Sequence, residues 1–282
     1  MDDYIRHLFP YLDSSRIMTL SCGHVIPKEN LIAIPISVGP NDVELEFTFE
    51  KRHQSNTIDA LGSTITKLAE VIPDGLVVFF PSYGYLEQVI SRWQTSRPGS
   101  GSTWSRLLAH KPVFRESKES TSVESTLEQY SAAINSNKGA LLLSVVGGKM
   151  SEGINFSDRL GRGVIVVGLP FPNIQSAEWK AKMQYIESST VARGGGSAEG
   201  KAAAREFYEN ACMRAVNQSI GRAIRHRGDY ASIVLLDRRY GTKRIQEKLP
   251  GWIRSGLIGG GEGVRFGTAV PRIQGFFEQK RH

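Results

Sequence analysis

The sequence predicts an α/β domain built as a doubly wound, mostly parallel sheet flanked by helices. Five apolar runs rich in β-branched residues recur, and they are continuous rather than alternating, which is typical of strands buried on both faces. They are "LIAIPI" (31–36), "GLVVFF" (75–80), "GALLLSVV" (139–146), "GVIVVGL" (163–169) and "ASIVLL" (231–236). Helical patterns lie between several of these runs, and such alternation predicts βαβ units.

The segments between the strands predict the rest of the organisation. Helices are predicted at 56–72, 83–94, 122–136 and 175–188, and a long one before the last strand. Glycine- and serine-rich stretches at 95–103 and 189–200 predict flexible loops. Residues 1–20 predict a connector or short amphipathic helix that belongs to a preceding domain, and residues 21–282 are expected to form the α/β domain.

Composition narrows the classes of protein and of site. A hydrophobic content of 40% and a charged content of 22% are ordinary for a globular protein. The formal net charge of +7 favours an anionic partner such as nucleic acid, although only weakly. The 2 cysteines form no CxxC pair and the 6 histidines show no metal-ligand spacing, so neither a disulfide framework nor a metal site is predicted. The sequence has no run of 18 apolar residues, so no membrane span is predicted.

Two glycine-rich stretches differ in what they predict. "GGKMSEGINF" (147–156) directly follows a predicted strand, where open α/β sheets bind ligands. Its glycines and Lys149 could bring N–H groups and a cation to phosphates, or the stretch could be a turn without a ligand. "GGSAEGKA" (195–202) fits most of a phosphate-loop pattern, but Ala202 replaces the magnesium-binding hydroxyl and the stretch follows a helix. It is predicted to be a linker.

A cluster of basic residues lies in "AVNQSIGRAIRHRGDY" (215–230). At about 100° per residue, a helix would place Gln218, Arg222 and Arg225 on one narrow face. The opposite face would carry apolar side chains that pack on the sheet: Met213, Val216, Ile220, Ala223 and Ile224. Two guanidiniums on one face suit a triphosphate or a carboxylate-rich surface. A surface salt-bridge network is the alternative.

A third stretch, "VVFFPSYGYLE" (77–87), reads as a strand followed by a helix. Ser82 is a natural N-cap for that helix. Ser82 and Tyr83 also stand at the carboxyl end of a strand, where a hydroxyl and a ring could contact a sugar–phosphate backbone. Both interpretations stay open.

Together and in this order, the three stretches resemble motifs IV, V and VI of the XPD-like group of superfamily 2 helicases. "VVFFPSYGYLE" resembles motif IV, "GGKMSEGINFSDRLGRGVIVVGLPFP" motif V and "QSIGRAIRHRGDYASIVLLDRRY" motif VI. Within the group, the chain is most similar to the eukaryotic chromosome-loss (ChlR-type) helicases, and "CGHVIPKENL" and "LEFTFEKR" strengthen that match. The resemblance extends from about residue 17 to the end.

The resemblance implies the second RecA-like motor domain of an ATP-dependent DNA helicase with 5′-to-3′ polarity. It implies that Arg222 and Arg225 are arginine fingers and that Gln218 positions the attacking water or the γ-phosphate. Three residues of motif V are implied at the nucleotide: Glu152, which would couple it to DNA, Gly153 and Asn155. The implied DNA contacts are Ser82, Tyr83, Lys149 and Ser151. Asn155 departs from the group, since many members carry Asp there, which puts its nucleotide contact in doubt.

Partners and cofactors follow from the same resemblance. It implies ATP and Mg²⁺ shared with a first motor domain of the same protein, single-stranded or forked DNA as substrate, and a 4Fe–4S cluster that this chain does not bind. It also implies replication and cohesion factors as partners, a nuclear location, and roles in DNA repair, DNA replication and sister-chromatid cohesion. Because the chain lacks an intact phosphate loop and a DEAH-type magnesium box, it is expected to be the C-terminal half of a helicase and inactive alone. The alternative is a non-catalytic nucleic-acid or protein-binding module that retains the fold.

Overall fold

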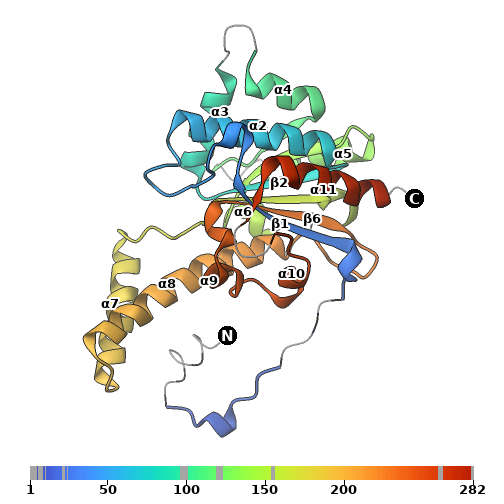
Figure 1. Cartoon of the computed structure of the whole chain (residues 1–282). Helices are drawn as coiled ribbons and strands as arrows, with labels where there is room; N and C mark the ends of the chain where they lie inside the picture. Colours follow the sequence, from blue (N-terminus) through green and yellow to red (C-terminus); the bar gives the residue numbers. More distant parts are fainter. Residues whose placement is uncertain are drawn as a thin grey trace. The chain divides into compact units, whose positions relative to one another are not determined.

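The computed structural model (Figure 1) divides into two compact units, Met1–His24 with Phe171–Arg214 and Val25–Pro170 with Ala215–His282. The residues that the structure describes are 5, 9, 11–20, 23, 25–95, 101–118, 123–153, 156–259 and 263–280; of residues 14, 152 and 153 only the backbone is described. The predicted boundary between a connector and an α/β domain near residue 20 stays a prediction.

The larger unit is built on a parallel sheet with the strand order β3-β4-β2-β5-β6-β1-β7. Its strands are β1 (Leu31–Val38), β2 (Gly75–Phe80), β3 (Val113–Arg115), β4 (Ala140–Val145), β5 (Gly163–Val167), β6 (Ala231–Leu236) and β7 (Val264–Arg265). The predicted α/β fold class is confirmed, and the five predicted apolar runs form five of these strands. The short strands β3 and β7, at the two edges, were not predicted, because so few residues carry no readable period.

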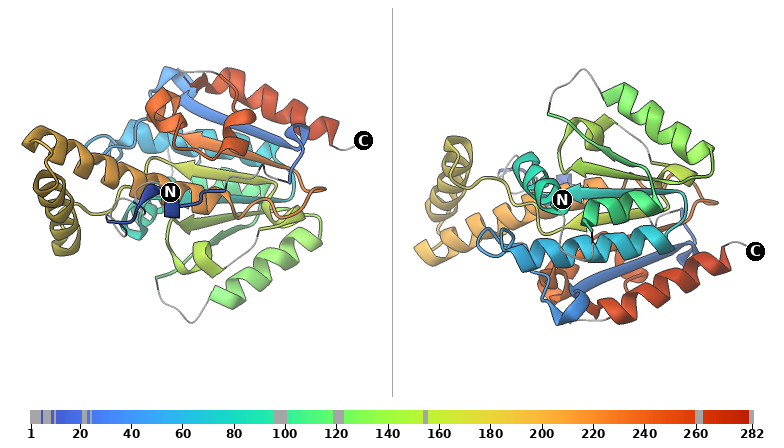
Figure 2. Two further views of the ribbon diagram at one scale, coloured as in Figure 1. Left: turned by 90° about the horizontal axis from the view of Figure 1, so that it is seen from below. Right: turned by 90° about the horizontal axis from the view of Figure 1, so that it is seen from above.

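Helices cover both faces of this sheet (Figure 2). They are α2 (Ser55–Val71), α3 (Tyr83–Gln94), α4 (Thr103–His110), α5 (Val123–Asn135), α6 (Lys149–Gly153), α9 (Lys243–Gln246), α10 (Gly251–Ser255) and α11 (Phe266–Gln279). Residues of α2, α3, α4 and α11 form one continuous core with alternate residues of the strands. On the other face, the Tyr130 ring of α5 meets Phe156, which in turn meets Phe79 of β2. Among the described residues, no helix has the length and apolar character needed to cross a bilayer.

The smaller unit holds α7 (Ala177–Ala192) and most of α8 (Ser197–Ile220), which ends in the larger unit. Aromatic side chains pack the two helices, since the Trp179 ring lies 5.6 Å from that of Tyr208. The Tyr208 hydroxyl donates to the carbonyl of Pro172 (2.6 Å). The loop predicted at 189–200 is mostly helical, because alanine-rich sequence extends α8 and only residues 193–196 turn. The segment predicted as a linker at 195–202 does follow a helix, but α8 begins at Ser197, so the linker prediction is wrong from residue 197 onward.

Two other predicted segments fall partly outside the described residues. Residues 96–100 of the loop predicted at 95–103 are not described, and Ser102 caps α4 by accepting from Ser105 N–H (3.0 Å). Residues 1–4, 6–8 and 10 of the predicted N-terminal helix are not described either. What is described there is a 3₁₀ turn, Ser14–Arg16, with Tyr11, Met18 and Leu20 exposed.

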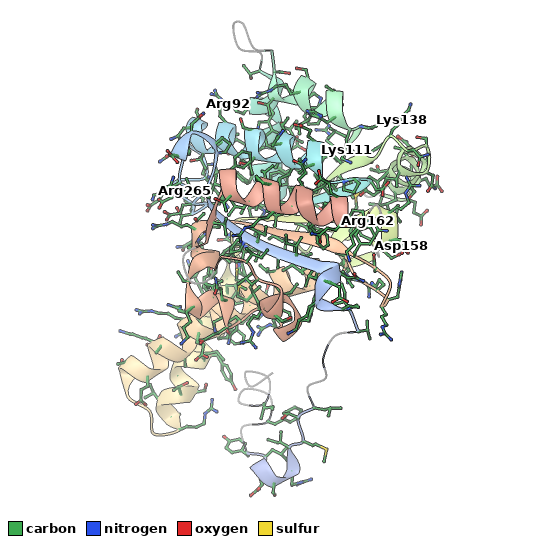
Figure 3. The ribbon with its side chains drawn as sticks, turned by 45° about the vertical axis from the view of Figure 1, so that its right-hand side comes forward. Arg92, Lys111, Lys138, Asp158, Arg162 and Arg265 are labelled. Carbon is green, nitrogen blue, oxygen red and sulfur yellow. The ribbon has the colours of Figure 1, made fainter. Side chains whose placement is uncertain are left out.

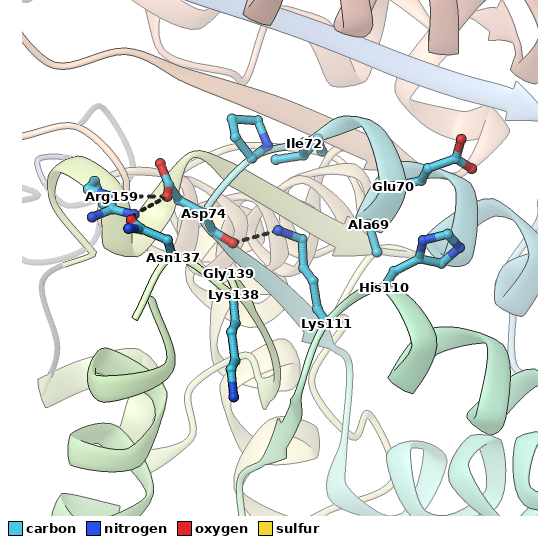
Figure 4. A pocket seen from close by; sticks show the side chains of 11 residues that line it. Ala69, Glu70, Ile72, Asp74, His110, Lys111, Asn137, Lys138, Gly139 and Arg159 are labelled. Atoms are coloured by element: carbon cyan, nitrogen blue, oxygen red, sulfur yellow. Dashed lines mark hydrogen bonds and ion pairs between the residues drawn. The ribbon is translucent and has the colours of Figure 1, made fainter. Parts of the chain in front are cut away.

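The amino ends of β2, β3 and β4 surround a hollow of about 320 Å³ (Figure 4). Lys111 lies in it with only 5% of its surface exposed, and its Nζ donates to the carbonyl of Asp74 (2.7 Å). Arg159 binds the Asp74 carboxylate (2.8 Å), so that carboxylate is already paired. Burial lowers the pKa of Lys111 from 10.5 to about 8. A Cβ on Gly139, which has φ +64°, would lie 2.6 Å from Lys111 Nζ, so the site requires glycine.

We predict that Lys111→Met removes an alkaline rise in stability. A lysine with a lower pKa when folded holds fewer protons in the folded state, so the free energy of unfolding increases with pH between about 8 and 10.5. The increase is on the order of 1–3 kcal/mol. Urea unfolding of wild type and variant from pH 7 to 10.5 measures it as the difference between the two curves. Lys138→Met, an exposed lysine of the same hollow, should run parallel to wild type. Parallel curves for Lys111→Met would contradict the burial argument.

Candidate functional site at the carboxyl edge of the sheet

The carboxyl ends of two neighbouring strands bring two predicted stretches together. Phe80, the last residue of β2, pairs with Val145, the last residue of β4. The residues after them, Ser82 and Tyr83 on one side and residues 146–151 on the other, therefore leave the sheet side by side. The prediction that both stretches follow strand ends is confirmed.

A buried carboxylate joins these two stretches. Glu116 follows β3, only 1% of its surface is exposed, and it accepts hydrogen bonds from two side chains and two backbone N–H groups. The donors are Tyr83 Oη (2.7 Å), Ser144 Oγ (2.7 Å), Val145 N (2.9 Å) and Met150 N (3.1 Å). A buried carboxylate is strongly disfavoured unless its oxygens are hydrogen-bonded, and here four donors meet that need. Glu116 thus fixes the turn after β4 against the start of α3.

Tyr83 is held in one orientation by this contact. Burial, together with the hydrogen bond to the Glu116 carboxylate, raises the pKa of the Tyr83 hydroxyl to about 12. The hydroxyl therefore keeps its proton at neutral pH and donates it to Glu116. The ring is half-buried, which leaves part of it open to solvent beside the strand end.

Two glycines allow the turn after β4 to approach Glu116. Gly147 has φ +70°, a backbone conformation that L side chains rarely adopt. A Cβ on Gly148 would lie 2.8 Å from the Tyr83 hydroxyl and closer still to the Glu116 carboxylate. The glycine-rich sequence here is thus a requirement of close packing, and the turn ends in α6 with Lys149 exposed.

The other predicted contacts of this edge occupy different environments. The Ser82 hydroxyl accepts from Tyr85 N–H (3.3 Å), which confirms its N-cap role. Only 3% of Ser151 is exposed and its hydroxyl donates to the carbonyl of Gly148 (2.9 Å), so it braces the turn and does not present its hydroxyl at the surface. Asn155 lies outside the described residues, and only the backbone of Glu152 and Gly153 is described.

The basic cluster is not one continuous helix, which corrects the sequence-based prediction. Helix α8 ends at Ile220, and the N–H groups of Arg222 and Ala223 donate three residues back, to Ser219 (3.3 Å) and Ile220 (3.1 Å). The Arg222 carbonyl instead accepts from Phe156 N–H (3.1 Å). Gly221, a poor helix former, stands at this exit. The helical-face geometry predicted for the two arginines therefore does not apply.

The side chains of the cluster nonetheless separate by polarity. Those predicted to pack on the sheet are all buried: Met213, Val216, Ile220, Ala223 and Ile224. Gln218 is exposed in the last turn of α8, Arg222 is half-buried in the turn that follows, and Arg225 is exposed beyond it. The predicted burial of the apolar set is confirmed, although Ala223 and Ile224 lie past the end of α8, and the three polar side chains come from a helix end and a loop.

A buried ion pair, which the sequence-based analysis missed, lies next to the loop that follows α8. Asp229 is fully buried and accepts from Arg162 Nη1 (2.8 Å) and from Asp158 N–H (3.3 Å). The Arg162 guanidinium lies 3.7 Å from the centroid of the Tyr230 ring. His226 contacts Asp158 (2.8 Å) at the surface. Figure 3 labels Asp158 and Arg162 on this side of the larger unit.

Three of these side chains, Asp158, His226 and Asp229, have ligand atoms within 4.8 Å of one another, a spacing that a metal ion could use. The Arg162 guanidinium already neutralises Asp229, and His226 already contacts Asp158. The Arg162 guanidinium and the His226 ring thus take contacts that a metal would need. We assign no metal to the cluster.

We predict that Gly148→Ala destabilises the protein while Gly84→Ala does not. The new methyl group at position 148 would displace Glu116 or Tyr83, at an expected cost of about 1–3 kcal/mol in the free energy of unfolding. Gly84, exposed in the first turn of α3, has no atom within 4 Å of the position that a Cβ would take and serves as the matched control. Chemical denaturation of both variants measures the effect. Equal stability of the two variants would contradict the assigned packing.

Comparison with known proteins shows which family the chain is similar to. Residues 65–256 match the family model described as "Helicase C-terminal domain". A relative from Coccidioides immitis, "ATP-dependent DNA helicase CHL1", is 54% identical and aligns with 99% of this chain and 33% of its own length. The protein of that name from Aspergillus niger is 52% identical and aligns with 99% of this chain and 33% of its own length. The one from Schizosaccharomyces pombe is 46% identical and aligns with 100% of this chain and 32% of its own length. The chain spans about a third of the length of these curated relatives.

Solved structures support the fold. An XPD helicase structure has a TM-score of 0.50 and 23% identity over 77% of this chain and 33% of that chain. An apo XPD structure has a TM-score of 0.52 and 22% identity, and the match covers 77% of this chain and 37% of that chain. The family model and the relatives agree with one another. The chain therefore belongs to the helicase C-terminal domain family, in its XPD-like, ChlR-type branch, and is a helicase motor domain.

Proposed function

We propose that this chain is the second motor domain of an ATP-dependent DNA helicase and that it supplies arginine fingers and contacts to single-stranded DNA. The observation that carries the proposal is the Glu116 network, which joins the stretches resembling motifs IV and V at one edge of the sheet. Relatives named ATP-dependent DNA helicase, 54% and 52% identical, support it.

Contacts to DNA are proposed at the exposed and half-exposed groups of that edge. Lys149 is exposed on the turn after β4, and the Tyr83 ring is held beside it by Glu116. A cation and a ring at a strand end suit a sugar–phosphate backbone. Ser82 keeps one hydroxyl proton for a phosphate while it caps α3. Ser151, buried under the same turn, is proposed to support these groups rather than to touch DNA.

Contacts to nucleotide are proposed at the end of α8. Gln218, Arg222 and Arg225 offer an amide and two guanidiniums without a carboxylate among them, a donor set that fits phosphate oxygens and not a metal ion. Mg²⁺ ligands are therefore expected from the first motor domain, where ATP is proposed to be shared between the two domains. Glu152, Gly153 and Asn155 stay proposed neighbours of the nucleotide on sequence grounds alone. A 4Fe–4S cluster does not fit this chain, which has only 2 cysteines.

The biological role is proposed at the level of the whole protein. We infer 5′-to-3′ unwinding of forked DNA in the nucleus, with partners from replication and cohesion, from the resemblance to ChlR-type helicases. Unwinding assays on duplexes with either a 5′ or a 3′ single-stranded tail test the polarity. A non-catalytic binding module is the rival function, and the arginine variants predicted below separate it from a motor.

We predict that Arg222→Ala or Arg225→Ala, in the longer protein that carries this chain, lowers the rate of ATP hydrolysis by about 10³–10⁵ without unfolding the domain. Both side chains lie outside the buried core, so their loss removes charge stabilisation at the γ-phosphate rather than packing. Lysine at either position should rescue only partly, because it lacks the planar fork. The measurements are kcat and the melting temperature.

The matched controls are Ile220→Asp and Ile224→Asp, which place a carboxylate in the core. These variants should melt early, whereas the arginine variants should melt like wild type. If the arginine variants hydrolyse ATP at the normal rate, or melt as early as the isoleucine variants, the segment is structural and the arginine-finger assignment is wrong.

We also predict that the 282-residue chain alone binds single-stranded DNA but does not hydrolyse ATP. Its net charge of +7 and its strand-end cation support binding, and the affinity should fall steeply with salt because binding releases counterions. Hydrolysis should stay at background, since the sequence has no intact phosphate loop. Fluorescence anisotropy and phosphate release on one sample measure both. Turnover that survives repurification, or an affinity independent of salt, would contradict this prediction.

A further inference from the structure

An exposed aromatic side chain stands on the segment between β1 and α2. Phe49 has 77% of its surface exposed, although its neighbours Leu45 and Phe47 are buried. Phe47 N–H donates to the buried carboxylate of Asp237 (2.9 Å), the residue that directly follows β6. The segment is therefore anchored at the carboxyl edge of the sheet, the edge that also carries Ser82 and Tyr83.

Phe49 is held in place by polar and aromatic neighbours. The Arg52 guanidinium lies 5.2 Å from the Phe49 centroid and 5.4 Å from that of Tyr85. The His53 ring packs edge-on against both rings, at 5.5 Å and 5.9 Å. These contacts hold Phe49 beside the guanidinium while most of its ring stays exposed to solvent.

Hydrogen bonds fix the orientation of the histidine. Arg52 Nε donates to His53 Nε2 (3.1 Å), so that nitrogen is the acceptor. His53 Nδ1 then carries the hydrogen and donates to Gln88 Oε1 (2.5 Å) of α3. The cluster of Phe49, Arg52 and His53, which we name the Phe49 platform, is thereby tied to α3, whose first residue is Tyr83.

The charge of the platform is not neutralised within the described part of the chain. Lys51 nearby is bound to Glu46 (2.6 Å), whereas no described carboxylate contacts the Arg52 guanidinium. Burial lowers the pKa of Arg52, so an added anion would stabilise its charged form. The Tyr85 hydroxyl below it is buried without a hydrogen-bond partner. An exposed ring beside a cation that has no described carboxylate partner indicates a ligand with an aromatic face and an anionic group.

We propose that the Phe49 platform stacks one base of single-stranded DNA on Phe49 and binds the adjoining phosphate through Arg52. Every base offers a flat face, so such a contact tolerates any sequence, as a translocating motor requires. The platform shares its edge of the sheet with Tyr83 and Lys149, the DNA contacts proposed above, and therefore extends the same track. This inference rests on the proposed binding of single-stranded DNA.

A protein surface is the other occupant that an exposed phenylalanine could have. The charge favours nucleic acid, because an uncompensated guanidinium stacked under the ring matches a phosphate next to a base. A protein partner would have to bury that cation beside the ring, which is costly unless it supplies its own carboxylate. The experiment separates the two.

The test compares two strands of equal length and charge, oligo(dT) and an abasic strand, by fluorescence anisotropy with the 282-residue chain. Phe49→Ala should weaken binding of oligo(dT) by about 5- to 150-fold, the value of one stacked base, and leave binding of the abasic strand unchanged. Phe49→Trp should keep or increase the affinity for oligo(dT). Arg52→Gln should weaken binding of both strands to a similar extent, because it removes a phosphate contact. Tyr185→Ala, an exposed aromatic residue of α7, is the matched control and should change neither affinity.

The outcomes are distinct. If wild type binds oligo(dT) but Phe49→Ala binds both strands as wild type does, the stacking site is wrong and DNA binding by the chain stands. If wild type binds neither strand at low salt, the proposed DNA-binding function fails as well. If Phe49→Ala leaves DNA affinity intact but lowers the melting temperature of the longer protein, the ring packs on protein and the stacking proposal is overturned. An unchanged melting temperature of the variant chain shows that a loss of affinity reflects the missing ring.

Discussion

The buried carboxylate of Glu116 is the interaction on which the carboxyl edge of the sheet depends. Four donors satisfy it, and they come from a side chain after β2, a side chain and a backbone N–H of β4, and a backbone N–H of α6. None of the four is a cation. A buried carboxylate that contacts no cation among the described residues depends on these donors, so they favour a single arrangement of Tyr83 and the turn at 147–150. The close approach of the turn to Glu116 requires glycine at positions 147 and 148.

The extent to which the fold could be predicted from the sequence depends on the length of each signal. Runs of five to eight apolar residues gave β1, β2, β4, β5 and β6, and α3 was predicted with the bounds that it has. The edge strands β3 and β7 are paired on one side only and are too short to carry a period. The end of α8 was missed because a periodic pattern continues past Ile220, while tertiary hydrogen bonding to Phe156 takes the Arg222 carbonyl out of the helix.

The candidate site could be predicted only at the level of its stretches. Parallel strands place their carboxyl ends at one edge, so "PSY" and "GGK" could be expected near each other from the sequence. The sequence could not show which of these side chains are exposed and which are buried, because that depends on contacts between residues distant in sequence. Glu116 is 33 residues from Tyr83, and it directly follows β3, a strand too short for the sequence to reveal. Ser151 looked like a surface hydroxyl, yet the turn that Glu116 fixes buries it.

The segment resembling motif V is held at both of its ends, and this has a mechanical consequence. At its start, Met150 N–H is bound to Glu116; at its far end, Asp158 N–H and Arg162 are bound to Asp229, and Phe156 N–H to the Arg222 carbonyl. A shift of the loop that carries Arg222 and Arg225 must therefore either break a buried ion pair or move the segment. Breaking that pair by removing one partner costs about 3–5 kcal/mol. Moving the segment is opposed at Glu116, which also holds Tyr83, and at Asp74 and Tyr130, which bind Arg159 and the Leu160 carbonyl. The buried carboxylates of Asp229 and Glu116 thus connect the loop of the proposed nucleotide contacts to the proposed DNA track, with no need for a direct contact between the two proposed sites.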